Sequence, residues 1–278
     1  MLATLRRIGA RSVLYLLLAL FAVTTLFPLV WMLYSSFKTN GDIALSTFAL
    51  PGIWHVENYV NAWQTAKIGT YFFNSVIVSL GAVGLTILAG ASAGFILAKF
   101  RFGLRGVVYG FFILGMLIPL QSVLVPLFIQ MRDFKLLDNP WSLILSYTAF
   151  GLPITIFLME SFLRAFPDSV LEAAILDGAS LLRVFWALVL PMSKPVLATV
   201  AILNFLNNWK EFSFALIFLT TEEKKTLPLG LYNFLGAYTA DYAGLMAALM
   251  IASIPLLILY FVLQEQIIKG MTAGAVKG

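Results

Sequence analysis

The feature that most constrains this chain is a series of long segments without a charged residue. A helix needs about 20 mainly apolar residues to cross a lipid bilayer. Five segments reach this length, at residues 12–34, 72–98, 106–131, 140–159 and 242–264. One further segment, 195–221, which is the fifth of the six in chain order, is interrupted only by Lys210 and Glu211. We therefore predict an all-α membrane protein with six transmembrane helices.

The composition agrees with this prediction. Of the 278 residues, 61% are hydrophobic and 11% are charged, and the mean hydropathy is +0.94. A soluble domain carries about 25% charged residues, so this chain has too little charge to cover a water-exposed surface. Cysteine is absent, which excludes disulfides, thiolate metal sites and cysteine nucleophiles. The single histidine, His55, is interpreted as a loop residue, so we expect neither a metal site nor catalytic residues.

The first apolar segment follows Arg6, Arg7 and Arg11, as the hydrophobic part of a signal peptide would. It is longer than the roughly 7–15 residues of such a part, and no small-residue cleavage site follows it. We expect a retained transmembrane helix.

Basic residues predict the orientation, because Lys and Arg are enriched on the cytoplasmic side. One set of connecting segments holds eleven of them: Arg6, Arg7, Arg11, Lys99, Arg101, Arg105, Arg164, Arg183, Lys194, Lys269 and Lys277. The other set holds six: Lys38, Lys67, Arg132, Lys135, Lys224 and Lys225. Both termini and residues 160–194 are therefore expected in the cytoplasm, and residues 36–70, 132–139 and 222–241 outside. The formal charge of +5 then reflects topology and not a nucleic-acid partner.

Small residues and prolines mark several of these helices. Gly90 and Gly94 stand in GxxxG register, which lets helix backbones approach closely. Prolines at 119, 126, 153 and 255 each remove a helix hydrogen bond and invite a kink.

The cytoplasmic segment at about 166–194 has the pattern of a helix–turn–helix. Ser169 followed by Glu172 matches a capping box at the start of a short helix. Gly178 is placed to end that helix, and Ser180 can cap a second one over 181–190. Pro191 and Pro195 are expected to stop the second helix.

The first of these helices suits docking onto another protein. Ala173 and Ala174 leave a low ridge, and Glu172 and Arg183 can make polar contacts at its rim. The alternative is an amphipathic surface linker, which the spacing alone does not exclude.

This segment resembles a known family. Glu172-Ala173-Ala174, three residues, Gly178, nine residues, Leu188, one residue and Leu190-Pro191 match the EAA loop of ABC importer permeases, with Leu188 at the usual isoleucine position. Three further stretches look like the carbohydrate-uptake, MalG-like branch: residues 177–180, 194–199 and 270–278.

The resemblance implies a type I ABC importer permease fold and a set of partners. These are a second related permease in a heterodimer, two ATP-binding subunits, a solute-binding protein outside, a sugar substrate and membrane lipid. It implies a multi-pass protein of a bacterial or archaeal cytoplasmic membrane. It also divides the chain into 1–71, a five-helix core at 72–268 that contains the EAA loop, and a cytoplasmic tail at 269–278.

In that family the EAA loop sits in a cleft of the ATPase and couples nucleotide-driven closure to transport. The residues carried over to this contact are Glu172, Ala173, Ala174, Asp177, Gly178, Arg183 and Pro191. The chain has no Gly-Lys dipeptide and hence no Walker A loop. We therefore expect a transport subunit that is not an enzyme and binds no cofactor itself, with ATP and Mg on the partner.

Polar residues line one face of the fifth apolar segment. Asn204, Asn207, Asn208 and Glu211 are spaced i, i+3, i+4 and i+7. Such groups are costly in a membrane unless they meet protein or water. They are interpreted as the substrate pathway, and a helix–helix polar seam is the alternative. Gln121 and Asn74 are weaker candidates for the same pathway.

Trp209 and Lys210 flank this polar face. Trp209 is expected either to stack on a sugar ring or to lie in the aromatic belt. The resembled family usually reads Trp-Asn-Glu-Phe here, whereas this chain has Lys210. The lysine can pair with Glu211 or with a partner subunit, or attract an anionic substrate. A neutral oligosaccharide is favoured, and an acidic sugar or a sugar or glycerol phosphate is the alternative.

Two peripheral segments carry expectations of their own. The aromatic-rich outer segment at about 36–71 is expected to form a folded cap. The basic C-terminal tail, including residues 274–278, is expected to contact the ATPase.

An ion-coupled secondary transporter or channel is the rival to the importer. That class usually places carboxylates or histidines at the bilayer midplane, where only Lys210 and Glu211 are available. It is also often built from inverted repeats, and none is evident. A membrane-embedded enzyme is a third class, but no Ser/His/Asp arrangement lies at a membrane boundary.

Overall fold

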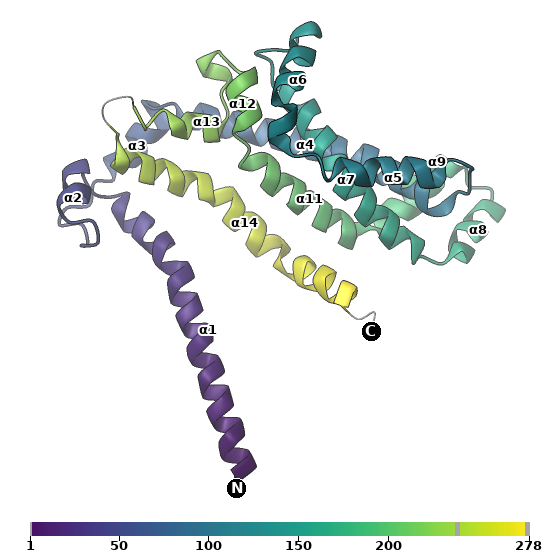
Figure 1. The fold of residues 1–278 in the computed structure, drawn as a ribbon, viewed down its shortest axis with the longest axis horizontal. Coiled ribbons are helices and arrows are strands. Elements are labelled where there is room, and N and C mark those ends of the chain that lie inside the picture. The colour runs from purple at the N-terminus through teal and green to yellow at the C-terminus, as the bar shows by residue number, and fades with distance from the viewer. Residues whose placement is uncertain (1, 237–239, 276–278) are drawn as a thin grey trace. The chain divides into compact units, whose positions relative to one another are not determined.

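The computed structural model of the chain is helical (Figure 1). It describes residues 2–236 and 240–275, with side chains described at 11–236, 240–262 and 264. Within these residues no β-strand forms, so the predicted all-α class is confirmed. The contact expected of the C-terminal tail falls on side chains outside the described residues.

Four long helices coincide with four of the predicted transmembrane segments. They are α1 (Leu2–Ser35), α4 (Ile68–Lys99), α7 (Pro140–Arg164) and α14 (Tyr242–Ala275). Each contains a stretch long and apolar enough to cross a membrane. Pro153 and Pro255 lie inside α7 and α14 without ending them.

The third predicted segment is two helices and not one kinked helix. α5 (Arg105–Gly115) and α6 (Leu120–Asp133) are bent by 102° across a short break. Pro119 precedes α6 with extended backbone angles, φ −69° and ψ 134°. A proline has no amide hydrogen to continue the helix and also disfavours helical geometry in the residue before it.

The fifth predicted segment is interrupted where the sequence indicated. α11 (Lys194–Trp209) ends just before Lys210, and α12 (Ser213–Phe218) starts three residues later. Between the two helices, residue 210 forms a turn and residues 211–212 have no regular secondary structure. We call residues 210–212 the α11–α12 break.

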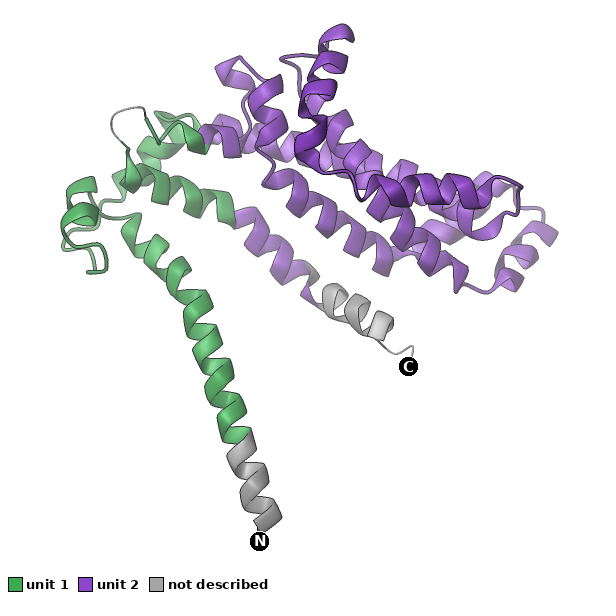
Figure 2. Cartoon of the chain, viewed as in Figure 1, with its two compact units in different colours: residues 1–68, 231–253 green, residues 69–230, 254–278 purple. Residues whose placement is uncertain are grey.

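The chain divides into two compact units (Figure 2). Unit 1 comprises residues 1–68 and 231–253, and unit 2 comprises residues 69–230 and 254–278. Unit 1 contains the short helices α2 (Asn40–Leu45) and α3 (Glu57–Gln64), which fold the outer segment that follows α1. Two further short elements, η2 (Glu222–Lys224) and α13 (Leu227–Tyr232), follow α12.

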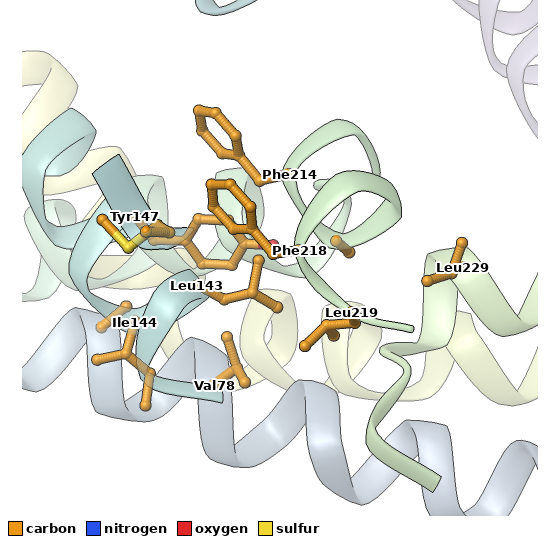
Figure 3. Close-up of a cluster of buried hydrophobic side chains, with 11 residues drawn as sticks. Val78, Leu143, Ile144, Tyr147, Phe214, Phe218, Leu219 and Leu229 are labelled. Carbon is orange, nitrogen blue, oxygen red and sulfur yellow. The ribbon is translucent and has the colours of Figure 1, made fainter. Parts of the chain in front are cut away.

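Unit 2 contains two buried apolar clusters. The first joins α4, α7 and α12, and Figure 3 shows Phe214 and Phe218 beside Tyr147, with Val78 and Leu143 nearby. The rings of Phe214 and Phe218 stack with centroids 5.5 Å apart. The second cluster joins α4 and α7 to the short helices at residues 168–192. Its members include Phe95, Met159, Leu171, Phe185 and Val189.

Close packing of α4 against α7 explains the two spaced glycines. A Cβ atom on Gly94 would lie 2.6 Å from Cβ of Met159, and one on Gly90 would overlap Thr155. Real Cβ atoms do not approach that closely, so only glycine allows this contact. The GxxxG prediction is confirmed for this helix pair.

Candidate coupling segment and substrate cavity

The segment between α7 and α11 is a pair of short helices, as predicted. The first, α8 (Asp168–Leu176), has Pro167 at its N-cap and no side-chain cap. The capping box expected at Ser169 is therefore wrong. The helix begins one residue before Ser169, which places that hydroxyl inside the first turn and out of the capping position.

The turn after α8 confirms the prediction that Gly178 ends the first short helix. Its φ of +83° lies in the left-handed region that favours glycine. The amides of Gly178 and Ala179 donate to the carbonyls of Ile175 (2.9 Å) and Ala174 (3.0 Å), which closes the helix end. Ser180 then caps the next helix, because its hydroxyl accepts from the Arg183 amide at 3.3 Å.

The second helix runs further than expected. It comprises α9 (Leu181–Val184), the π-helical turn η1 (Phe185–Val189) and α10 (Leu190–Met192). Pro191 therefore lies inside it and does not stop it. The wider π turn, in which the Leu190 amide donates to the Phe185 carbonyl, accommodates a proline ring that would clash in a regular helix. α11 starts two residues later, bent by 77°.

The tip of this coupling segment, residues 168–192, is exposed. Glu172, Ala173, Asp177, Gly178, Arg183 and Pro191 are exposed, and Ala174 is half-buried. Large apolar side chains on either side of the turn are also exposed, and the most exposed are Leu176 (87%), Leu182 (73%) and Trp186 (55%). Leu176, Leu182 and Trp186 were not among the predicted contact residues. They could have been found as large apolar residues in a segment predicted to face the cytoplasm.

The base of the coupling segment is anchored to α4. Lys99, whose side chain is buried, donates to the Phe166 carbonyl and to Asp168, both at 2.6 Å. The hydrogen bond and charge of Lys99 hold the pKa of Asp168 below its ordinary value of 3.8. Beside it, the buried carboxylate of Glu160 on α7 pairs with Arg105 and Arg164.

A cavity of about 440 Å³ lies in unit 2 among α6, α7, α11 and the α11–α12 break. Its polar lining includes Ser213 and six residues from the sequence prediction: Gln121, Asn204, Asn207, Asn208, Lys210 and Glu211. The structure thus brings together six of the eight residues assigned to the substrate pathway. Tyr147, Phe150 and Phe214 supply aromatic walls, a combination typical of ligand pockets.

The four polar residues predicted to share one helix face, Asn204, Asn207, Asn208 and Glu211, differ in their hydrogen bonding. The Asn204 amide donates to Thr155 Oγ1 (3.0 Å) and to the Val200 carbonyl (2.9 Å), so it also forms a seam between α11 and α7. Asn207 is exposed. Asn208 is buried, and its Nδ2 has no hydrogen-bond partner among the described residues.

Glu211 stabilises the break. Its carboxylate accepts from the Tyr147 hydroxyl (2.7 Å) and from the amides of Phe214 (2.8 Å) and Ala215 (3.4 Å) at the start of α12. Lys210 is exposed and forms no ion pair with Glu211 or with any other described residue. Pairing between the two, one option from the sequence, is therefore not observed.

Trp209 and Asn74 lie outside the cavity. Trp209 is 4% exposed, stacks on Phe205 with centroids 5.4 Å apart, and meets Phe72 edge-on. The interpretation of Trp209 as a sugar-stacking residue is corrected, because its ring is buried between α4 and α11. Asn74 donates to the carbonyls of Glu223 (2.8 Å) and Lys225 (2.9 Å), so it holds the loop after α12.

Among the described residues no group of three His, Cys, Asp or Glu side chains could hold a metal ion. His55 pairs with Glu57 (2.5 Å) in unit 1.

Comparison with known proteins gives a consistent result. Residues 87–273 match the family described as binding-protein-dependent transport system inner membrane component. The diacetylchitobiose uptake system permease protein NgcG of Streptomyces coelicolor is 41% identical over 97% of this chain and 89% of its own length. The probable ABC transporter permease protein YurM of Bacillus subtilis is 38% identical over 98% of this chain and 90% of its own.

A solved structure has the same fold. It is a bacterial ABC transporter involved in import of the acidic polysaccharide alginate, and its matching chain superposes with a TM-score of 0.81. The match covers 91% of this chain and 94% of that chain at 24% identity.

Proposed function

Because the chain belongs to the family of binding-protein-dependent transport system inner membrane components, we propose that it is the permease subunit of an ATP-driven importer of a sugar or oligosaccharide. The polar cavity carries this proposal. It lies within a membrane-spanning bundle, at a break in a helix that starts directly after the coupling segment. Polar groups at membrane depth are retained where they meet a substrate or water.

An oligosaccharide is the favoured substrate. Sugar hydroxyls lose water on entry and need replacement donors and acceptors, which the Asn and Gln side chains of the cavity supply. The relative named as a diacetylchitobiose uptake permease supports this substrate class.

Lys210 keeps an acidic sugar or a sugar phosphate as the alternative. Its ammonium has no ion partner among the described residues, whereas the carboxylate of Glu211 is occupied by Tyr147 and two amides. Replacing Lys210 with Asn should weaken transport of an anionic sugar and leave that of a neutral one near the wild-type rate. Competition uptake assays with matched neutral and anionic oligosaccharides distinguish the two classes.

The coupling segment is proposed to dock onto a separate ATPase, which binds ATP and Mg. A second related permease, two ATP-binding subunits and an outer solute-binding protein complete the importer. In this arrangement both termini and the coupling segment face the cytoplasm. Glu172, Asp177 and Arg183 supply polar contacts, and the exposed Leu176, Leu182 and Trp186 supply apolar area.

The rival ion-coupled mechanism is less well supported by the geometry. A coupling carboxylate must exchange protons or ions, but both oxygens of Glu211 accept hydrogen bonds that hold α12 and Tyr147.

Reconstitution in liposomes tests the proposal. The complete importer should take up labelled sugar only when ATP is supplied to the ATPase side, and omission of this chain should abolish uptake. Accumulation driven by an ion gradient, in liposomes that contain this chain and no ATPase, would contradict it.

A further inference from the structure

The loop after α2 in unit 1 is unusually apolar for a segment outside the membrane helices. Residues 44–54 contain no charged side chain. Four apolar side chains of this range are largely exposed: Leu45 (91%), at the end of α2, and Leu50 (72%), Ile53 (70%) and Phe48 (69%). Trp54 is exposed as well. A water-facing loop of this kind would expose a continuous hydrophobic patch, which soluble surfaces rarely do.

The polar groups of the same loop are turned inward. The hydroxyls of Ser46 and Thr47 donate to the carbonyls of Asp42 and Ile43, both at 3.1 Å. Both carbonyls lie in the last turn of α2, where carbonyls run short of helix partners, and the Asp42 carbonyl also accepts the Ser46 amide (2.9 Å).

Three consecutive carbonyls of the loop accept hydrogen bonds from side chains at the end of α1 and just after it. Trp31 Nε1 donates to Thr47 (2.9 Å), and the Tyr34 hydroxyl donates to Phe48 (3.0 Å). Lys38 Nζ donates to Ser46 (3.0 Å) and Thr47 (3.2 Å). In water these carbonyls would accept hydrogen bonds from solvent and would not need side-chain donors. In an apolar medium each unsatisfied carbonyl is costly.

The environment of Lys38 indicates most clearly that the loop faces an apolar medium and not water. Its side chain is buried, with the residue 1% exposed, and the ammonium lies 5.2 Å from the centre of the Tyr34 ring. No carboxylate pairs with it among the described residues. A buried cation is expensive, and here its donors satisfy loop carbonyls.

The loop also lies beside the apolar part of α1. The ring of Phe48 is 6.0 Å from that of Phe27 and 6.4 Å from that of Trp31. Phe27 precedes the end of α1 at Ser35 by eight residues, which is about 12 Å along a helix. Side chains from 11 to 30 on α1 are all exposed. Phe48 therefore continues the apolar surface of a membrane-crossing helix.

We propose that residues 44–54 form an interfacial anchor, with Leu45, Phe48 and Leu50 immersed in the outer part of the bilayer. Lipid is the partner, because residues 44–54 are uncharged, the hydroxyls of Ser46 and Thr47 and the carbonyls of residues 46–48 are bonded within the chain, and the apolar surface is continuous with that of α1. Trp31 and Tyr34 lie at the depth where aromatic residues meet lipid headgroups.

Fluorescence quenching tests the proposal, and the absence of cysteine makes it direct. Phe48→Cys is labelled with bimane in detergent, and the assembled transporter is reconstituted into liposomes. Gln64→Cys, at an exposed polar position on α3, is the matched control, and Leu50→Cys replaces Phe48→Cys if that variant does not assemble.

If residues 44–54 lie in the bilayer, nitroxide-labelled lipid should quench the label at position 48 severalfold more strongly than aqueous iodide does. The order should be reversed at position 64. Quenching by iodide equal to that at position 64 would show a water-facing loop and overturn the proposal. Protection from both quenchers would show that another protein covers the loop, which also overturns it.

Discussion

At the scale of single residues, Glu211 determines the geometry of the cavity. One carboxylate bridges α7, through Tyr147, and the first amides of α12, through Phe214 and Ala215. These amides lie at a helix start, where four N–H groups lack helix partners. The Glu211 side chain therefore stabilises the break between α11 and α12.

Glu211→Ala should lower the thermal stability of the purified importer. The substitution leaves the buried Tyr147 hydroxyl and two amides without an acceptor, at a cost of about 1–3 kcal/mol. Glu211→Gln, which keeps one acceptor oxygen, should lose less. Differential scanning fluorimetry in detergent measures both, and equal stability of Glu211→Ala and wild type would contradict the assigned role.

The site residues could be predicted from sequence only where local spacing decides them. The i, i+3, i+4, i+7 pattern placed Asn207, Asn208 and Glu211 on one face. Spacing could not show that Asn204 bonds to Thr155, or that Trp209 packs on Phe72, because those partners lie far away in sequence. Tertiary contacts decide such roles.

At the scale of helices, the approach of α4 to α7 depends on glycine. Gly94→Ala places a methyl group 2.6 Å from Cβ of Met159, and such overpacking costs about 1–3 kcal/mol. Gly84→Ala is a matched control on the same helix, because nothing lies within 4 Å of its Cβ position. We expect a lower melting temperature and less assembled importer for Gly94→Ala alone. Equal effects of the two substitutions would exclude close packing as the cause.

The anchor between α4 and α8 should depend on pH. Lys99 lowers the pKa of Asp168 from 3.8, so the anchor contributes fully above that value and is lost as the pH falls through the lowered pKa. A spin label on Leu176→Cys should be less mobile at pH 7 than at an acidic pH below the lowered pKa of Asp168. Adding Asp168→Asn should give the same high mobility at both pH values, because the ion pair with Lys99 is then absent throughout. Mobility that is unaffected by this substitution would show that Lys99 and Asp168 do not hold the segment.

The helices themselves were largely predictable, and their interruptions were less so. Apolar length alone gave the positions of α1, α4, α7 and α14. The sequence predicts a kink at Pro119, whereas the structure has a 102° break there. It predicts a helix end at Pro191, whereas Pro191 lies inside a helix, just after a π turn. A proline removes a hydrogen bond in either case, and the surrounding packing decides whether the helix bends, breaks or widens.

At the scale of the molecule, α11 connects the coupling segment and the cavity, the two regions of unit 2 to which we assign function. It begins directly after the coupling segment and ends at the cavity, and its 16 residues span about 24 Å. A displacement of the coupling segment by an ATPase would therefore move the polar face of the cavity through one continuous helix. This connection is our physical account of how ATP hydrolysis drives transport.

Simultaneous measurement of sugar uptake and ATP hydrolysis in the reconstituted importer tests this account most directly, with variants at Gly178. Gly178 has φ +83° and nothing within 4 Å of its Cβ position, so Gly178→Val strains the turn by about 1–3 kcal/mol without a clash inside this chain. Gly178→Asn is the control, because asparagine tolerates this conformation.

We predict that Gly178→Val keeps ATP hydrolysis but lowers uptake per ATP by about tenfold, the factor that 1.4 kcal/mol of lost coupling gives. Gly178→Asn should stay near the wild type. Wild-type uptake per ATP in Gly178→Val, in fully assembled importer, would contradict the claim that this segment transmits the ATPase motion.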